Sequence, residues 1–201
     1  IGIIDAANIL TITGKAAEMN TAYASSGISG LGNEAAILSD SSLSASILNA
    51  LDENTSGVIN AKSILELTGK VSDLIKAYNS PGIIGLGDES IILSNIHTLE
   101  DLKAINNATS GAITLYDNTV ALSGTSADLL DAFTGTFNST YTGSLTITDA
   151  SGTNISAADL AAIGSATTGT VTATNAIAIS GTVAEVTAVL ITTESKVNIA
   201  S

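Results

Sequence analysis

The residues best suited to acid–base or metal chemistry in this sequence are a single histidine and a few acidic turns. His97 is the only histidine among 201 residues, and the chain has no cysteine. No second ligand accompanies His97 at a recognisable spacing, so we expect a solvent-facing loop residue ahead of a helix. The G-x-S-x-G elbow is absent and no serine has a histidine base in a plausible partner segment, so hydrolase chemistry is not indicated.

Two acidic turns are the best candidates for a metal site. Asn33-Glu34 and Asp88-Glu89 end the repeated string Gly-Ile-x-Gly-Leu-Gly-(Asn/Asp)-Glu. Calcium needs six or more oxygen ligands and the nonapeptide calcium repeat is absent, so turn formation is the favoured interpretation over calcium binding. The Gly-Leu-Gly strings at Gly30 and Gly85 lack the spacing and basic residues of a phosphate cradle. We therefore expect no catalytic, cofactor-binding or metal-binding residues, and no enzyme.

Threonine alternates with apolar residues in two segments, residues 146–148 and 170–174. Such alternation can place rows of threonine on one flat sheet face, the geometry that an ice-binding or glycan-binding surface uses. The threonines do not recur in every repeat, however. The β-propensity of threonine on an exposed strand is therefore the favoured interpretation, and a binding surface is the alternative.

Composition narrows the classes of partner. Six lysines oppose 19 acidic residues, which gives a formal charge of −13. A chain this acidic repels phosphate backbones and anionic lipid headgroups, so we expect no nucleic-acid partner and no membrane insertion. Divalent-cation binding or spacing between crowded copies would use the charge, but plain solvation is the favoured interpretation. The low aromatic content of 3% and the many small polar residues are typical of secreted bacterial repeat proteins.

These residues belong to elements that recur along the chain. Residues 56–80 predict two short strands, 58–61 and 64–67, followed by a helix over 70–78 with apolar residues at helical spacing. The inward row of the second strand is expected at Leu65 and Leu67. Residues 1–26 match this unit, and residues 27–55 and 82–109 form a second type. Its strands are expected at 28–31, 36–38, 83–86 and 91–93.

The repeats predict one continuous array over residues 1–201. Each strand-strand-helix rung has about 27 residues and each pair of rungs about 55, which is the range of solenoids. The expected rungs are 1–26, 27–56, 57–81, 82–110, 111–136, 137–168 and 169–194, with a partial rung at 195–201. Because one rung buries too little apolar surface to fold alone, rungs must stack. Helical crossovers then make the strands parallel and the winding right-handed, so we expect a right-handed α/β solenoid with parallel sheets.

Helix starts support these divisions. A hydroxyl residue followed three positions later by a carboxylate forms a capping box. This pattern occurs at Thr98, Thr125, Ser156 and Thr182. Lys15 and Lys70 occupy the same position in the first rung type and cannot accept an amide, so Thr13 and Thr68 are the expected substitutes.

One motif extends across the chain. The string Thr-Gly-(Lys/Thr)-x-(Ala/Ser)-(Asp/Glu)-(Leu/Met/Val) is seen at residues 13–19, 68–74, 123–129 and 180–186. With the Gly-Ile-x-Gly-Leu-Gly string, it resembles the long tandem-repeat surface proteins of bacteria, especially marine cyanobacteria. Lys15, Lys70 and residues 137–154 depart from that pattern. The resemblance implies very long, exported, cell-surface or filament-forming chains whose repeats have no enzymatic role.

We therefore expect a structural segment of an extracellular or cell-surface protein, a stiff spacer or a subunit of a fibre, filament or surface layer. Neighbouring copies or adjacent repeats of the same chain, joined end to end, are the expected partners. The alternative is an adhesive or ligand-binding module that presents an exposed threonine-rich sheet face to glycan, ice or another surface.

Overall fold

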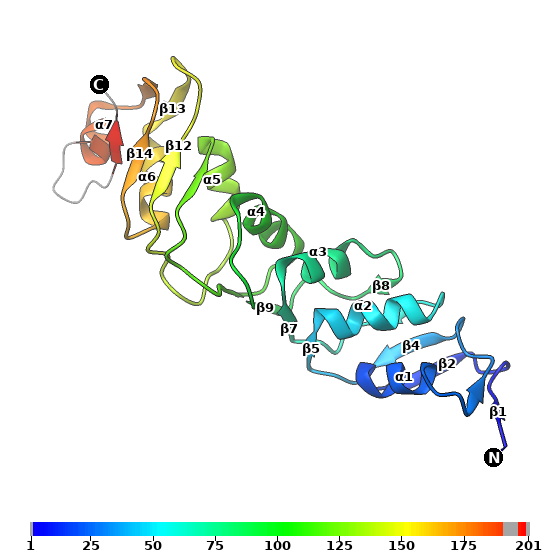
Figure 1. Ribbon diagram of the computed structural model, residues 1–201. Coiled ribbons are helices and arrows are strands. Elements are labelled where there is room, and N and C mark those ends of the chain that lie inside the picture. The colour runs from blue at the N-terminus through cyan, green and yellow to red at the C-terminus, as the bar shows by residue number, and fades with distance from the viewer. Residues whose placement is uncertain (1, 191–196, 200–201) are drawn as a thin grey trace. The chain divides into compact units, whose positions relative to one another are not determined.

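The computed structural model describes residues 2–190 and 197–199 (Figure 1). Over these residues the chain is a mixed α/β protein with parallel sheets and seven helices, which confirms the predicted α/β class. It divides into two compact units, Ile1–Asn95 with Ala108–Ala112, and Ile96–Asn107 with Ile113–Ser201. Each unit is described by itself.

The first unit alternates short strands with helices that pack side by side. Its elements are β1 (Ile4–Asp5), β2 (Thr11–Gly14), α1 (Ala16–Tyr23), β3 (Ile28–Ser29), β4 (Ala35–Leu38), β5 (Ser42–Ser44), α2 (Ala45–Asn54), β6 (Ile59–Asn60), β7 (Glu66–Gly69), α3 (Val71–Asn79), β8 (Ile83–Ile84) and β9 (Ser90–Leu93). The parallel ladders run β2-β4-β6-β8, β5-β7-β9 and β1-β3. Thr11 pairs with Ala35, and Ala36 with Ile59, so partners lie 24 and 23 residues apart. This is shorter than the predicted rung.

The core of this unit is aliphatic. Leu48, Leu67 and Leu74 are fully buried between the sheets and the helices. The expectation for Leu65 is wrong, because that side chain is 70% exposed. The strand β7 begins only at Glu66, so Leu65 lies in the preceding turn, where its carbonyl accepts the amide of Ser90 at 2.9 Å.

The second unit repeats this layering. Its elements are α4 (Leu99–Ala108), of which all but the last residue belong here, β10 (Ile113–Thr114), β11 (Leu122–Gly124), α5 (Ser126–Ala132), β12 (Leu145–Ile147), β13 (Asn154–Ser156), α6 (Ala157–Ala166), β14 (Val171–Ala173), β15 (Ala178–Ser180), α7 (Val183–Leu190) and β16 (Val197–Ile199). One parallel sheet has the order β11-β12-β14-β16, and β13 pairs with β15. Of the predicted partial rung, β16 is described and the flanking residues lie outside the described part.

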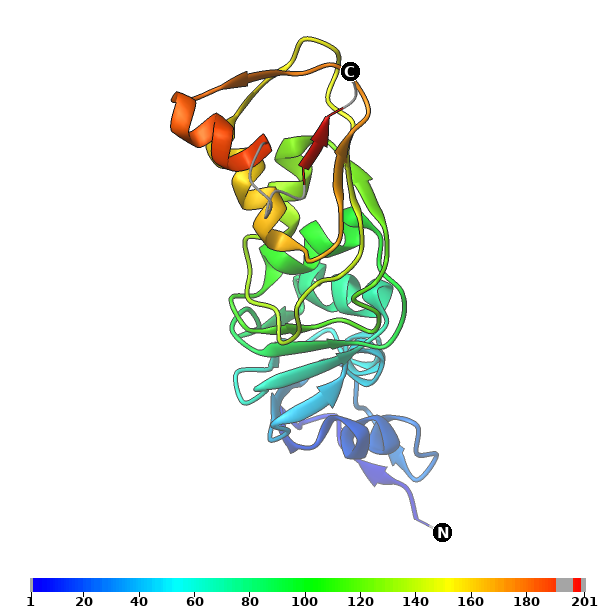
Figure 2. The same cartoon turned by 90° about the vertical axis from the view of Figure 1, so that its left-hand side faces the viewer.

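The inner side of the sheet β11-β12-β14 forms the core with the helices. Leu122, Leu145 and Val171 are register partners and are buried against Leu129 of α5 and Leu160 of α6. Figure 2 shows these helices on one side of the second unit and the strands on the other. The opposite side of the sheet faces solvent, because residues alternate between the two faces of a strand.

The predicted capping boxes are present. Thr98 accepts the amide of Asp101 at 3.2 Å, and the Asp101 carboxylate accepts the amide of Thr98 at 2.9 Å. Thr125, Ser156 and Thr182 likewise accept the amide three residues on.

The expectation that Thr13 and Thr68 replace the missing caps is wrong. The side chains of Lys15 and Lys70 make no capping bond. The first helical amides instead donate to side chains 24 residues later in the chain, Ala16 to Asp40 and Val71 to Asn95, both at 2.9 Å. The helix start in one rung is therefore completed by the next rung.

Candidate functional site

The clearest candidate surface is the solvent side of the sheet β11-β12-β14. Ser123, Thr146 and Thr172 are direct cross-strand partners in its parallel register. Ser144 and Thr170 precede the paired residues of β12 and β14, and Thr148 and Thr174 follow them. We call these seven residues the hydroxyl face: Ser123, Ser144, Thr146, Thr148, Thr170, Thr172 and Thr174.

Burial alternates strictly along these strands. All members of the hydroxyl face are exposed except Thr146 in the central strand, which is half-buried. The residues between them, including Leu145, Ile147, Val171 and Ala173, are at most 1% exposed. The apolar residues hold the sheet against the helices, and this packing places the hydroxyl residues outward.

The hydroxyl groups of this face are almost unused by the protein. Thr174 donates to the carbonyl of Ile147 at 3.3 Å. Within the described part of the chain, the side chains of Ser123, Thr146 and Thr172 make no hydrogen bond. None of the seven members is ionisable. The face therefore offers neutral donors and acceptors to an external partner.

Sequence reasoning identified part of this surface. The segments 146–148 and 170–174 were expected to carry threonine rows, and the register brings them side by side. Ser123 was missed because the strand was predicted to end at residue 122, whereas β11 continues to Gly124. The period-two alternation from Ser123 to the buried Leu122 was the available signal.

The acidic turns are structural. Glu34 and Glu89 are each 1% exposed. The Glu34 carboxylate accepts the hydroxyl of Tyr23 and the amide of Gly32, the latter at 3.0 Å. Glu89 makes the same contacts with Tyr78 and with the Gly87 amide, at 2.8 Å.

Ionisation of these groups follows from their surroundings. Burial raises the pKa of Tyr23 to about 12, and its bond to the carboxylate adds to this effect. For Glu34, burial favours the neutral acid, but the bonds from Tyr23 and the Gly32 amide outweigh it and lower its pKa. Among the described residues, no group of three or more histidine, cysteine or acidic side chains could hold a metal ion.

His97 does lie in the loop before α4, but the expectation that it faces solvent is wrong. Its side chain is 1% exposed and its ring lies 6.1 Å from that of Tyr141. Neither ring nitrogen has a hydrogen-bond partner. Burial lowers the pKa of His97, against the opposing effect of Asp101 and Asp117. A neutral imidazole without a nucleophile or a second ligand is a core residue.

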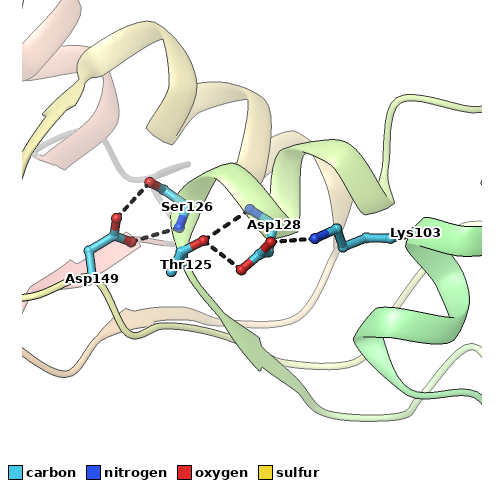
Figure 3. A network of polar contacts seen from close by, with 5 residues as sticks. All are labelled: Lys103, Thr125, Ser126, Asp128 and Asp149. Carbon is cyan, nitrogen blue, oxygen red and sulfur yellow. Dashed lines mark hydrogen bonds and ion pairs between the residues drawn. The ribbon is translucent and has the colours of Figure 1, made fainter. Parts of the chain in front are cut away.

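A polar network joins α4, the start of α5 and the turn after β12 (Figure 3). Lys103 forms an ion pair with Asp128, which also accepts the hydroxyl of Thr125 at 2.7 Å. Asp149 accepts the Ser126 amide at 2.6 Å and the Ser126 hydroxyl at 3.1 Å. Asp149 thus has the role of Asp40 and Asn95 in the first unit. The network fixes a helix start and contains no nucleophile–base pair.

Two shallow cavities lie beside α5 and α6. One, of about 420 Å³, is lined mainly by apolar residues such as Leu129, Phe133 and Ile163. The other, of about 340 Å³, is lined by residues 137–141 with Ser165 and Ala166. Its only ionisable group, Tyr141, donates its hydroxyl hydrogen to the carbonyl of Val120. Neither cavity holds convergent acid–base groups.

Comparison with known proteins adds no relative. No protein family, curated protein or solved structure matches this chain. None of the described helices combines the length and apolarity that crossing a bilayer requires.

Proposed function

We propose that this chain is a structural repeat segment of an extracellular protein, a stiff spacer or a subunit of a fibre, filament or surface layer. The observation that supports it best is the repetition of the parallel pairing. Ile4 pairs with Ile28, Ile59 with Ile83, and Asn154 with Ala178, each 24 residues apart. Elements that pair at a constant separation build a right-handed α/β solenoid of strand-strand-helix rungs.

The polar contacts support the double-rung period. The bond from Tyr23 to Glu34 recurs 55 residues later as the bond from Tyr78 to Glu89. A repeated contact between consecutive rungs stabilises an extended array rather than a single closed site. The chain has no enzymatic role in this proposal, since its buried ionisable groups are occupied by contacts within the protein.

The partners in this proposal are neighbouring copies or adjacent repeats, joined end to end. β1 and β2 lie at the edges of their ladders. Beside them Ile3 is 67%, Ile4 64% and Leu10 83% exposed. An edge strand flanked by exposed aliphatic residues fits another rung of the same type, which would extend the ladder and cover these side chains. The acidic surface keeps adjacent arrays apart.

Small-angle X-ray scattering of the chain at low concentration tests the shape. A compact globule of this length has a radius of gyration of about 16 Å. We expect a clearly larger value and a scattering profile with the slope of a rod. A radius of gyration at the compact value would overturn the proposal. Electron microscopy of the native material then tests whether regular filaments or layers form.

A second candidate function is binding through the hydroxyl face. The alignment of Ser123, Thr146 and Thr172 across three strands favours it. A rigid array can serve both functions, because binding uses one sheet face and stacking uses the strand edges.

A further inference from the structure

We propose that the hydroxyl face binds the surface of ice. This inference rests on the second candidate function, binding through that face, and names its ligand. It does not depend on the filament or spacer role, which uses other surfaces.

The hydroxyl face is a two-dimensional lattice. Parallel strands lie about 4.8 Å apart, and alternate residues along a strand are separated by about 6.6 Å. Ser123, Thr146 and Thr172 form one row across the strands, and Thr170, Thr172 and Thr174 form one column along β14. The water oxygens of ice repeat at separations of the same size. A periodic face is complementary to a periodic solid, whereas a single small ligand would need a concave site.

The lattice is held rigidly before any ligand arrives. The ladder bonds on either side of β12 are short, with the Leu122 amide 3.0 Å from the carbonyl of Ser144 and the Leu145 amide 2.9 Å from that of Thr170. Threonine is branched at Cβ, so few χ1 rotamers are available to it on a strand. Binding therefore orders few protein degrees of freedom, which lowers its entropic cost.

The chemistry of the face favours water over other partners. Each threonine presents a hydroxyl group, which joins a hydrogen-bonded lattice, and a methyl group, which fits between water molecules. No charged side chain is present to hold its own hydration shell, and no aromatic ring is present to stack on a sugar. The hydroxyls of Ser123, Thr146 and Thr172 have no partner in the described structure, so binding breaks no protein hydrogen bond there.

The first unit offers an internal contrast. Its corresponding cross-strand row consists of Thr13, Ile37, Asn60 and Ile84. Because polar and aliphatic side chains of different sizes alternate in that row, it has no regular hydroxyl spacing. The first unit therefore supplies a matched control position, since Thr13 is an exposed threonine on a parallel strand like Thr172.

The test is the partition of the full chain into a slowly growing ice hemisphere. We expect the native chain and the control Thr13→Lys to enter the ice. Thr172→Lys places a charged, bulky side chain in the lattice and should be excluded to a large extent. The far-ultraviolet circular dichroism spectrum and the melting temperature of each variant show whether it is folded.

Each outcome decides the inference. Exclusion of the native chain from ice overturns it, as does entry of a folded Thr172→Lys variant at the native level. If the chain is excluded from ice but is retained on crystalline cellulose or chitin, the ice inference fails and binding through the face stands. Retention on none of these solids overturns both. The scattering measurement on the array is independent of all these results.

Discussion

Tyr78 donates its hydroxyl hydrogen to the buried carboxylate of Glu89, 11 residues later in the chain. The carboxylate also accepts the amides of Gly87 and Asp88. Tyr78 closes the helix α3 and Glu89 precedes β9, so the contact fixes the connection between them. A buried carboxylate is stable only when such donors surround it.

Replacing Tyr78 tests the contribution of this contact. Tyr78→Phe removes one donor and leaves the carboxylate with backbone amides, so we expect a loss of about 1–3 kcal/mol in the free energy of unfolding. Urea unfolding followed by circular dichroism measures it. Tyr116→Phe is the matched control, because Tyr116 is 63% exposed, and it should leave the free energy unchanged. Equal effects of the two variants would contradict the assigned role.

The equivalent carboxylate, Glu34, predicts an acid-dependent loss of stability. Its pKa in the folded protein is lowered, so its contribution is complete above its ordinary pKa of 4.5 and is lost as the pH falls through the lowered value. We expect the free energy of unfolding to fall from about pH 5 to about pH 3, and Glu34→Gln to flatten this fall. The exposed residue Glu18 provides the control Glu18→Gln, which should keep the native slope.

His97 predicts a second transition at higher pH. Burial lowers the pKa of His97 in the folded protein, so the folded state favours the neutral ring and loses stability as the pH falls below about 6.5. Melting temperatures of the native chain should decrease from about pH 7 to about pH 5. Because no other histidine exists, His97→Phe should remove that decrease and keep the stability at pH 7. The same decrease in both proteins would refute this account.

Asp149 predicts coupling between a turn and the helix before it. Asp149→Ala removes two acceptors from Ser126 at the start of α5, so we expect a loss of about 1–3 kcal/mol in the free energy of unfolding. Asp131→Ala is the control, since that exposed side chain on α5 makes no hydrogen bond in the described structure. Urea unfolding of both variants measures the difference. A loss for Asp131→Ala as large as that for Asp149→Ala would contradict the coupling.

Local features of the fold were predictable from the sequence. The capping boxes at Thr98 and Thr125 form within four residues, so the pattern alone indicates where those helices begin. The segment 145–147 alternates apolar and polar residues and is observed as β12. Such features depend on neighbouring residues, and for that reason a sequence pattern can locate them.

The errors concern contacts between rungs. His97 and Glu34 look like polar loop residues, yet packing from other parts of the chain buries both. Asp40 gives no sign in the sequence that it completes a helix start 24 residues earlier. The contact depends on stacking, and the spacing of residues within one rung does not determine how the next rung is placed.

The hydroxyl face combines both kinds of information. Alternation in the sequence already specifies that Thr170, Thr172 and Thr174 share one side of a strand, because side chains point to opposite faces in turn. The register that aligns Thr172 with Thr146 and Ser123 is a property of the folded sheet. It is set where the buried leucine and valine partners pack together, and a shift of one residue would turn every hydroxyl inward.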